Sequence, residues 1–547
     1  MEQIYGQGVS SGMAYGRIYF VRADSSTVQE TSVLPEGNTE TERFRNACRI
    51  LQIELHELYQ KTRDTLGESE AEIFSVHQMM LEDDEYTELV EASIAEGRTA
   101  VEAVRQTGKA LAEMFSSMDT LYMQAREADI RGITDRLTEI LQGKQLAKIH
   151  LTEPSILAMH DLSPAQTMEL DLKMVLGFIT EQGSVNSHTA ILARTLGIPA
   201  ITAAGRMPEQ IHGKEAVLDG SCGILYITPD KDVLQKYKLS AAAESREREK
   251  WQSMRGHRCT GRNGIPIQIC SNAGSLEDIT AAMENDAEGI GLFRSEFLFM
   301  QYDRYPTEEE QYTVYCSVLE KMQGRDVVIR TLDAGADKKI SWLPCIPGEG
   351  NPALGFRAIR ICLRYPELLM TQLRALYRAS AGGKIHTLIP MIALPSELDR
   401  VLQIAEDVKK SLRQDSVPFD EHMPIGIMIE TPSAALQAEV LAGQAAFFSI
   451  GTNDLMQYTM AADRENDAVS YLTETVPESV KKLIRMTTEA AAKAGIPVSV
   501  CGELAGNPDM IPFFLQQGIT KLSVSPRQIL RVRLAVQSWL AKSVTQK

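Results

Sequence analysis

The spacing of apolar residues changes several times along the chain and divides it into segments. Residues 1–22 hold short apolar runs between glycines, which predicts short strands joined by turns. Residues 39–146 hold few glycines and almost no proline, and their apolar positions recur at helical spacing, as at Leu51, Leu55 and Leu58. This segment predicts a helical subdomain of about four helices.

Strand-like runs return after the helical segment. Five of them lie at residues 156–159, 175–179, 200–202, 216–218 and 224–227. The simplest organisation is one small α/β domain formed by residues 1–22 and 147–227, into which the helical unit 23–146 is inserted. Residues 228–258 are highly charged and helix-prone, and we expect them to form a linker helix.

Residues 259–547 repeat one pattern, in which an apolar run is followed by a helical spacer. Eight runs predict strands, at residues 265–270, 289–293, 327–331, 386–391, 425–429, 447–450, 498–501 and 521–524. Eight strands alternating with helices is the number found in a TIM-type (β/α)8 barrel. Short apolar runs also occur in buried helices, and the third spacer is long enough to carry extra elements. We therefore predict an α/β multidomain protein whose C-terminal domain is a (β/α)8 barrel.

The composition excludes several classes of protein. No segment reaches the roughly 18 uninterrupted apolar residues of a membrane span, and the N-terminus shows no secretory signal. The eight cysteines are scattered without a Cys-x-x-Cys pair, which argues against a zinc cage or a disulfide framework and fits a cytoplasmic protein. A net charge of −17 disfavours nucleic acid and suits a basic protein partner, although solubility alone explains most of these charges.

Polar residues gather at the C-terminal ends of the predicted barrel strands, where barrel active sites lie. Arg294, Arg330 and Arg464 suit a phosphate or carboxylate group, because a guanidinium forms charge-assisted bidentate hydrogen bonds. Glu430 and Asp454 suit one Mg²⁺, a hard ion that prefers oxygen ligands. The sequence therefore predicts a site for a small anionic phosphate ester and a divalent metal.

Cys501 ends the seventh predicted strand, where it can donate or accept a proton. A lone cysteine is more often a small core residue, and an isolated arginine or acid more often belongs to a surface ion pair. The functional interpretation depends on all of these residues meeting at one end of one barrel.

His188 is the most informative single residue outside the predicted barrel. It follows the small or polar residues Gly183, Ser184, Asn186 and Ser187, and it precedes an apolar helical stripe. A neutral imidazole is a good nucleophile near neutral pH, and free backbone N–H groups at a helix start can meet an anion. A lone histidine is more often structural, so the case comes from combining it with the barrel residues. Together they predict phosphoryl transfer from a small phosphate ester to His188.

Five motifs give the chain a close resemblance to a known family. They are Ser187-His188-Thr189, GLFRSEFLF at 291–299, NPALGFRAIR at 351–360, SIGTNDL at 449–455 and CGELAG at 501–506. With these motifs the chain resembles enzyme I of the bacterial phosphoenolpyruvate-dependent sugar phosphotransferase system, over nearly its whole length. Enzymes of this family phosphorylate themselves on a histidine and pass the phosphoryl group to the small phosphocarrier protein HPr.

The resemblance implies a role for each matching residue. His188 would carry the phosphoryl group on Nε2, and Cys501 would protonate the enolate to give pyruvate. Glu430 and Asp454 would bind Mg²⁺. The residues that would hold phosphoenolpyruvate are Arg294, Arg330, Asn453, Asp454 and Arg464, with Arg357 as a further phosphate contact.

The resemblance also implies partners. HPr would dock on the inserted helical subdomain, where residues 68–85 hold seven acids and no Lys or Arg. We take Glu68, Glu82 and Glu85 as candidate HPr contacts, although a solvated helix face explains any single acid equally well. His77 is expected to pack or to support this interface. The family further implies a homodimer formed through the barrel, and no contact with nucleic acid or membrane.

The chain departs from the family pattern in three places. The usual Gly-Gly-x-Thr-Ser-His run reads Gly-Ser-Val-Asn-Ser-His at 183–188, and the usual Asp-x-Gly-Gly-Asp-Lys reads Asp-Ala-Gly-Ala-Asp-Lys at 333–338. The sequence also ends sooner after Pro526 than family members do, which we expect to bear on dimer stability. These changes leave a second hypothesis open, a paralogue that binds HPr or phosphoenolpyruvate in a regulatory role with little turnover.

Overall fold

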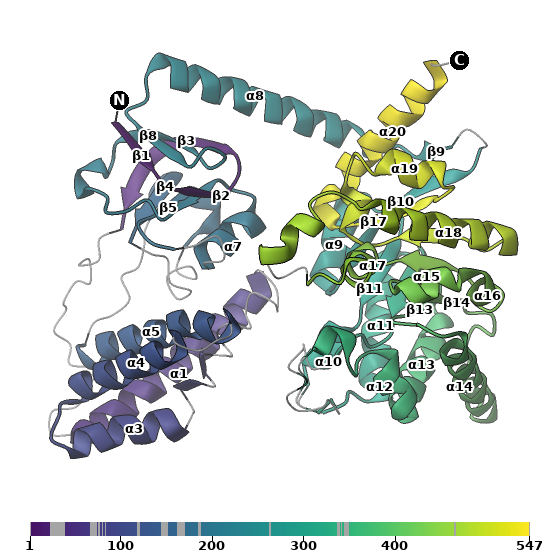
Figure 1. The fold of residues 1–547 in the computed structure, drawn as a ribbon, viewed down its shortest axis with the longest axis horizontal. Coiled ribbons are helices and arrows are strands. Elements are labelled where there is room, and N and C mark those ends of the chain that lie inside the picture. Colours follow the sequence, from purple (N-terminus) through teal and green to yellow (C-terminus); the bar gives the residue numbers. More distant parts are fainter. Residues whose placement is uncertain are drawn as a thin grey trace. The chain divides into compact units, whose positions relative to one another are not determined.

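The computed structural model describes most of the chain in two compact units, Met1–Ser245 and Arg246–Lys547. The described residues are 2–21, 39–65, 74, 77–78, 80–81, 84–116, 121–143, 151–160, 170–183, 188–261, 264–302, 304–335, 340, 342–343, 349, 351–463 and 467–545. Figure 1 shows the two units, coloured from the N-terminus to the C-terminus. No helix among these residues is long and apolar enough to cross a membrane.

An eight-stranded sheet forms the α/β part of the first unit, in the order β1-β8-β7-β3-β4-β5-β6-β2. Its strands are β1 (Glu2–Tyr5), β2 (Gln7–Ser10), β3 (Met13–Phe20), β4 (Ser155–Met159), β5 (Val175–Thr180), β6 (Ala200–Thr202), β7 (Glu215–Asp219) and β8 (Ile224–Ile227). Strand side chains alternate between two apolar clusters, one with Leu157 and Phe178 and the other with Ile156 and Ile179. The five strand predictions between 156 and 227 are confirmed.

The helix α7 (His188–Leu196) covers one face of this sheet. Its Ala190, Leu192 and Ala193 are buried in the same cluster as Leu157 of β4. These side chains of α7 therefore face the sheet, and among the described residues the helix begins at His188, as predicted.

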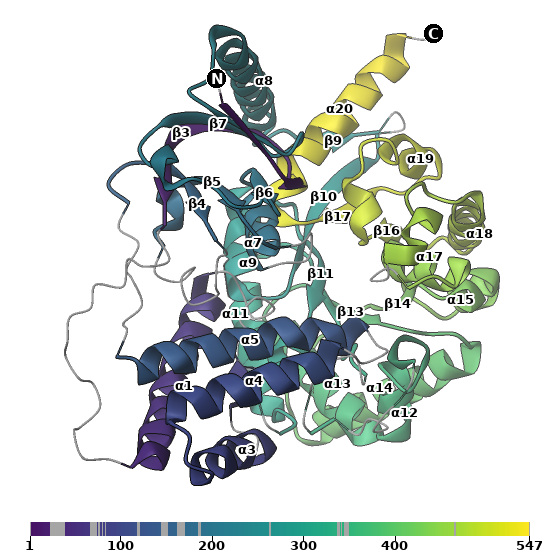
Figure 2. The same ribbon diagram turned by 60° about the vertical axis from the view of Figure 1, so that its left-hand side comes forward.

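The helical part of the first unit contains α1 (Glu40–Thr65), α3 (Asp84–Ala95), α4 (Ala100–Ser116) and α5 (Leu121–Leu141). Helices α4 and α5 lie side by side in both views (Figures 1 and 2). Gly108 permits this approach, because a Cβ there would lie only 2.0 Å from Thr134 Oγ1. Phe44, Leu51 and Leu137 belong to the apolar core between the helices. The predicted all-α subdomain is confirmed as a fold class.

The predicted linker helix is α8 (Lys231–Ser253). It is polar and mostly exposed, as its charge-rich sequence indicates. The boundary between the two compact units, Ser245/Arg246, falls inside it. The domain bounds given from the sequence stay a prediction.

The second unit is a closed barrel of eight parallel strands, with the short β9 (Cys259–Thr260) paired antiparallel to the first of them. The barrel strands are β10 (Pro266–Ala273), β11 (Ile290–Arg294), β12 (Val327–Arg330), β13 (Ile385–Ile389), β14 (Ile425–Ile429), β15 (Phe448–Ile450), β16 (Val498–Val500) and β17 (Lys521–Val524). The predicted TIM-type barrel is thus confirmed. The long third spacer does carry extra elements: η3 (Pro352–Leu354), α12 (Ile359–Arg364) and α13 (Pro366–Ser380).

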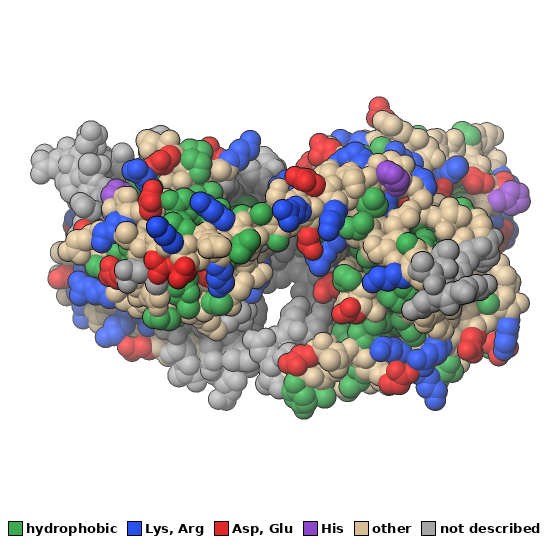
Figure 3. All heavy atoms as spheres, turned by 90° about the horizontal axis from the view of Figure 1, so that it is seen from above, with side chains coloured by type: hydrophobic (Ala, Val, Ile, Leu, Met, Phe, Trp, Pro, Cys, Tyr) green, Lys and Arg blue, Asp and Glu red, His purple; other side chains and the backbone are tan. Residues whose placement is uncertain are grey.

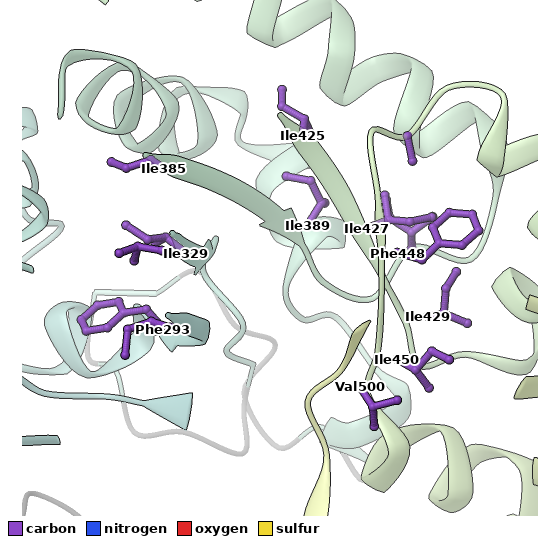
Figure 4. Packing of buried hydrophobic residues seen from close by; sticks show 14 of the residues in the cluster. Phe293, Ile329, Ile385, Ile389, Ile425, Ile427, Ile429, Phe448, Ile450 and Val500 are labelled. Carbon is purple, nitrogen blue, oxygen red and sulfur yellow. The ribbon is translucent and has the colours of Figure 1, made fainter. Parts of the chain in front are cut away.

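Successive side chains of a barrel strand are buried on opposite faces. Ile427 and Ile429 of β14 join the large cluster that also contains helix residues (Figure 4). Met428, between them, joins a separate cluster made only of residues on or next to strands, which fills the barrel interior. This alternation decides which residues at the strand ends face the mouth of the barrel, the end formed by the C-terminal ends of the strands.

A buried arginine fixes the C-terminal helix α20 (Ile529–Thr545) to the barrel. Arg533 is fully buried and pairs with Asp286, and Asp286 also accepts hydrogen bonds from Arg258 at 2.9 Å and from the Gly256 N–H at 2.8 Å. The surface carries charges of both signs. Figure 3 shows acidic and basic side chains interspersed on the visible face of each unit.

Candidate active site

Five of the predicted site residues lie at one end of the barrel. Arg294 and Arg330 end β11 and β12, Glu430 directly follows β14, Asp454 lies in the first turn of α17 (Thr452–Met460) after β15, and Cys501 directly follows β16. Because all these strands are parallel, their C-terminal ends meet at the mouth. Arg464 lies outside the described residues.

The strand alternation explains why three of these side chains face the mouth. Arg294, Arg330 and Glu430 each follow by two positions a residue of the interior cluster, and these interior residues are Leu292, Val328 and Met428. Side chains two apart on a strand share a face. Along each of these strands, the inward-facing side chains are therefore apolar inside the barrel and polar at its mouth.

Arg330 is the centre of a buried ion-pair network. Its Nη2 contacts Glu296, and its Nη1 lies 2.6 Å from Asp333 Oδ2. The other oxygen of Asp333 accepts a hydrogen bond from Arg357 Nη2 at 3.0 Å. All four side chains are buried, so the carboxylates offset the cost of burying two guanidinium groups.

The electrostatic balance around Arg330 keeps it charged. Burial alone lowers its pKa, but Asp333 and Glu296 outweigh burial and raise the pKa above its ordinary value. Arg294 differs, because it is exposed and none of the described carboxylates pairs with it. The site therefore offers one fixed and one accessible guanidinium to an anion.

Glu430 is a fully buried carboxyl with one unsatisfied oxygen. The Met391 N–H donates to Oε1 at 2.6 Å, whereas Oε2 is buried without a hydrogen-bond partner. Burial, together with the charges of Asp454 and Asp333, raises its pKa to about 8 against the opposing effect of Arg330. Gly451 leaves the approach to this oxygen open, since a Cβ there would lie 3.1 Å from Oε2.

The local chain holds Glu430 in place at the end of its strand. Thr431 caps α15 (Pro432–Leu436) by accepting a hydrogen bond from the Ala434 N–H at 3.1 Å. Its hydroxyl also donates to the Ile392 carbonyl at 2.9 Å. The Glu-Thr-Pro sequence thus ends β14 sharply and leaves the carboxyl of Glu430 at the mouth.

A buried, unsatisfied carboxylate oxygen beside a second carboxylate fits a divalent cation. Among the described residues no three acidic, histidine or cysteine side chains come together as a metal-binding group. Glu430 and Asp454 could supply two ligands to a hard cation, which also accepts water and substrate oxygens.

Asn453, in the first turn of α17, and Glu503, in the turn after Cys501, form a reciprocal pair. The Asn453 side-chain amide donates to Glu503 Oε1 at 2.9 Å, and its oxygen accepts from the Glu503 N–H at 3.0 Å. The amide predicted to hold substrate is thus bonded to the turn that follows Cys501. A substrate role for Asn453 stays a prediction.

Cys501 is buried in the interior cluster with polar partners on two sides. The Ser449 hydroxyl donates to its sulfur at 3.2 Å, and the Asn272 amide donates to its carbonyl at 3.1 Å. Asn272 is itself oriented by the Ser523 hydroxyl, which donates to it at 2.7 Å. Burial raises the pKa of the Cys501 thiol to about 11, so the thiol is protonated at neutral pH, as a proton donor must be.

The backbone of His188 begins α7, but its side chain and residues 184–187 lie outside the described part of the chain. The described residues that precede residue 184 are held by hydrogen bonds. Glu181, next to β5, accepts hydrogen bonds from the Met207 N–H at 2.6 Å and pairs with His160 at 2.8 Å. The strand end that leads to His188 is therefore anchored.

The side chains of the three candidate HPr contacts are not among those that the structure describes. Glu68 and Glu82 lie outside the described residues, and Glu85 belongs to α3 without a described side chain. His77 is buried, in keeping with the expectation that it packs.

The structure adds residues that the sequence did not single out. Glu296 and Asp333 hold Arg330, and the Tyr458 hydroxyl on α17 donates to the Ala353 carbonyl at 2.5 Å. Glu296 and Asp333 each lie close to a candidate arginine in the sequence, and each also belongs to a family motif, Glu296 to the run 291–299 and Asp333 to the run 333–338. Ser449 begins the motif 449–455, which carries the family resemblance but assigns no role to this serine.

The barrel has guanidinium and carboxyl groups at its mouth, and the same chain holds an α/β domain with a histidine at a helix start. This combination is typical of phosphoryl-transferring enzymes. Family comparisons agree. The PEP-utilising enzyme PEP-binding domain matches residues 248–540, the N-terminal domain matches 5–126 and the mobile domain matches 151–223.

Curated relatives identify the family within this class. Phosphoenolpyruvate-protein phosphotransferases of Priestia megaterium and Bacillus subtilis are 38% and 37% identical to the chain, and that of Listeria innocua is 36% identical. Each alignment covers 98% of this chain and 94% of the relative. The chain belongs to the phosphoenolpyruvate-protein phosphotransferase family and is an enzyme of the transferase class.

Proposed function

We propose that this enzyme phosphorylates itself on His188 from phosphoenolpyruvate in the presence of Mg²⁺, releases pyruvate and passes the phosphoryl group to HPr. One observation carries the barrel half of this proposal. The charged Arg330 and the unsatisfied carboxyl of Glu430 meet at the mouth of the barrel, beside the protonated thiol of Cys501.

The arginines bind the anionic ends of phosphoenolpyruvate. Arg294 is accessible, and Arg330 keeps its orientation through Glu296 and Asp333. Arg464, Arg357 and Asn453 are further contacts by matching motif. A Mg²⁺ held by Glu430 and Asp454 would neutralise charge on the phosphoryl group.

The phosphoryl group leaves for the His188 Nε2, which forms a P–N bond while the P–O bond to the enolate breaks. The enolate then takes the proton of the Cys501 thiol at its methylene carbon. The S–H bond breaks, a C–H bond forms and pyruvate leaves with a thiolate behind it. His188 must visit the barrel mouth for the first step.

HPr would receive the phosphoryl group at the helical subdomain, with Glu68, Glu82 and Glu85 as candidate contacts for a basic face. We further propose a homodimer through the barrel. Exposed apolar side chains on the barrel surface support it, among them Leu394, Leu436 and Val440. The regulatory alternative rests on the departures from the family pattern described above, and no described contact favours it.

Labelled phosphoenolpyruvate tests the proposal. With Mg²⁺ it should give an acid-labile phosphoprotein, with the label on the peptide that contains His188. His188→Ala should abolish labelling, whereas His257→Ala, at an exposed histidine after α8, should not. Cys501→Ala should still bind phosphoenolpyruvate but lose pyruvate formation. Label retained in His188→Ala would reject the assignment.

A further inference from the structure

We propose that Ser449 is a positioning residue for proton transfer, whose hydroxyl orients the Cys501 thiol and stabilises the thiolate left after the proton has moved. This inference rests on the proposed role of Cys501 as the acid. It assigns a function to a side chain that otherwise looks like a small filler of the barrel interior.

The geometry places the two side chains in one polar contact. Ser449 lies in the middle of β15 and is fully buried, and its Oγ lies 3.2 Å from the sulfur of Cys501, which directly follows the neighbouring strand β16. The thiol itself donates toward the Ile450 carbonyl at 3.6 Å. The sulfur therefore accepts from Ser449 and donates elsewhere, so the Ser449 contact does not occupy the transferable proton.

The apolar surroundings of the sulfur strengthen the effect of the Ser449 hydroxyl on the thiolate. The interior cluster around the sulfur consists of the apolar residues Leu292, Val328, Leu388, Met428 and Phe447. A thiolate in such surroundings is poorly solvated, and a hydrogen bond to it is stronger than one in water. The charged groups that act on Cys501 are Glu430, Arg330 and Arg294, and Ser449 acts with the two arginines to favour the thiolate.

The proton balance is simple. The Cys501 S–H bond breaks as the C–H bond of pyruvate forms, and the Ser449 O–H proton stays on its oxygen throughout. The serine hydrogen bond strengthens as charge develops on sulfur, so it acts mainly in the transition state. Its loss should lower kcat for pyruvate formation and leave substrate binding nearly unchanged.

A matched pair of variants separates this role from packing. Ser449→Ala removes the hydroxyl that meets the sulfur. Ser499→Ala removes a buried hydroxyl on the neighbouring strand, at the position paired with Ser449, which donates to the Phe448 carbonyl at 3.3 Å. Ser449→Thr keeps a hydroxyl at the first position.

Two measurements are made on the full-length enzyme. We expect Ser449→Ala to lower kcat for pyruvate formation about 10- to 100-fold with KM for phosphoenolpyruvate within about threefold, since hydrogen bonds to charged groups are worth a factor of this size. We expect the pH midpoint of Cys501 alkylation by iodoacetamide, followed on its peptide by mass spectrometry, to rise by about one unit. Ser499→Ala should change neither quantity, and Ser449→Thr should restore both.

An unchanged kcat in Ser449→Ala, or an unchanged alkylation midpoint, would overturn the proposal. So would a Ser449→Thr variant that melts at the wild-type temperature yet behaves like Ser449→Ala. Failure of the proposed function would give a different experimental result from failure of the Ser449 proposal. In that case the wild-type enzyme itself forms no pyruvate, while the alkylation midpoint still reports on the Ser449 contact.

Discussion

Arg330 and Asp333 are joined at the barrel mouth by an ion pair in which Nη1 and Oδ2 lie 2.6 Å apart. The second oxygen of the same carboxylate holds Arg357 at 3.0 Å. One carboxylate thus orients two guanidinium groups that the proposal assigns to phosphoenolpyruvate.

Asp333→Asn should weaken substrate binding. The amide keeps the shape of the side chain but removes the charge that holds both arginines, so we expect KM for phosphoenolpyruvate to rise about 10- to 100-fold. Steady-state kinetics at saturating Mg²⁺ measure this. Asp415→Asn is the control, because Asp415 pairs with Arg374 at the barrel surface. Equal KM values in the two variants would show that Asp333 does not organise the substrate site.

Tyr458→Phe should have a smaller effect on the same constant. The Tyr458 hydroxyl connects α17, which carries Asp454, to Ala353 of η3, the short helix that precedes Arg357. Loss of one neutral hydrogen bond should raise KM about 2- to 10-fold with little change in kcat. Tyr471→Phe, at an exposed tyrosine, provides the comparison. A fall in kcat without a change in KM would contradict this positioning role.

Glu430→Gln should remove the response to Mg²⁺. Added Mg²⁺ is expected to raise Tm of the wild-type enzyme, because a ligand that binds only the folded state stabilises it. The glutamine variant should show no such rise and should need far more Mg²⁺ for any activity, and EDTA should abolish wild-type labelling by phosphoenolpyruvate. Glu439→Gln, at an exposed glutamate of α16 (Ala438–Ala442), should behave like the wild type. A full Mg²⁺ response in Glu430→Gln would remove this residue from the metal site.

Asp286→Asn should destabilise the barrel in a pH-dependent way. Burial raises the pKa of Asp286, but hydrogen bonds from Arg258, the Gly256 N–H and Arg533 outweigh burial and hold the pKa well below its usual value. A depressed carboxyl pKa gives stability that is present above the unfolded-state pKa of about 3.9 and is lost as the pH falls below it.

We therefore expect Asp286→Asn to cost about 3 kcal/mol at pH 7, because it leaves the buried Arg533 with a weaker partner. The difference from wild type should shrink as the pH falls below about 4. Urea unfolding at several pH values measures it, with Asp407→Asn on α14 (Pro395–Gln414) as an exposed control that should unfold like wild type. A difference that grows toward low pH would contradict the assignment.

The barrel could be predicted from sequence because its strands are buried on both faces and so form nearly continuous apolar runs. The fourth strand shows where such reading fails. It was predicted over 386–391, but β13 ends at Ile389, because Pro390 has no N–H for the next ladder bond and Met391 adopts a positive φ of 58°. Met391 instead directs its N–H to Glu430.

The candidate site was predictable only in part. Arg330 and Glu430 could be placed at the mouth because each lies at or directly after the C-terminal end of a predicted strand, where the parallel strands of a barrel end together. The partners of Arg330 and Cys501 were harder to predict. Asp333 lies only three positions after Arg330, but that spacing alone does not predict an ion pair. Glu296 meets Arg330, and Ser449 meets Cys501, between neighbouring strands, which no local pattern encodes. Such pairings are tertiary and follow only once neighbouring strands are in register.

The most direct test of the central claim follows the phosphoryl group from one protein to the other. The enzyme is labelled with phosphoenolpyruvate and Mg²⁺, freed of both, and mixed with HPr. We predict that label leaves the His188 peptide and appears on HPr in equal amount, with one pyruvate formed earlier for each label. Label that stays on the enzyme, or appears as inorganic phosphate while HPr stays unlabelled, would contradict the account.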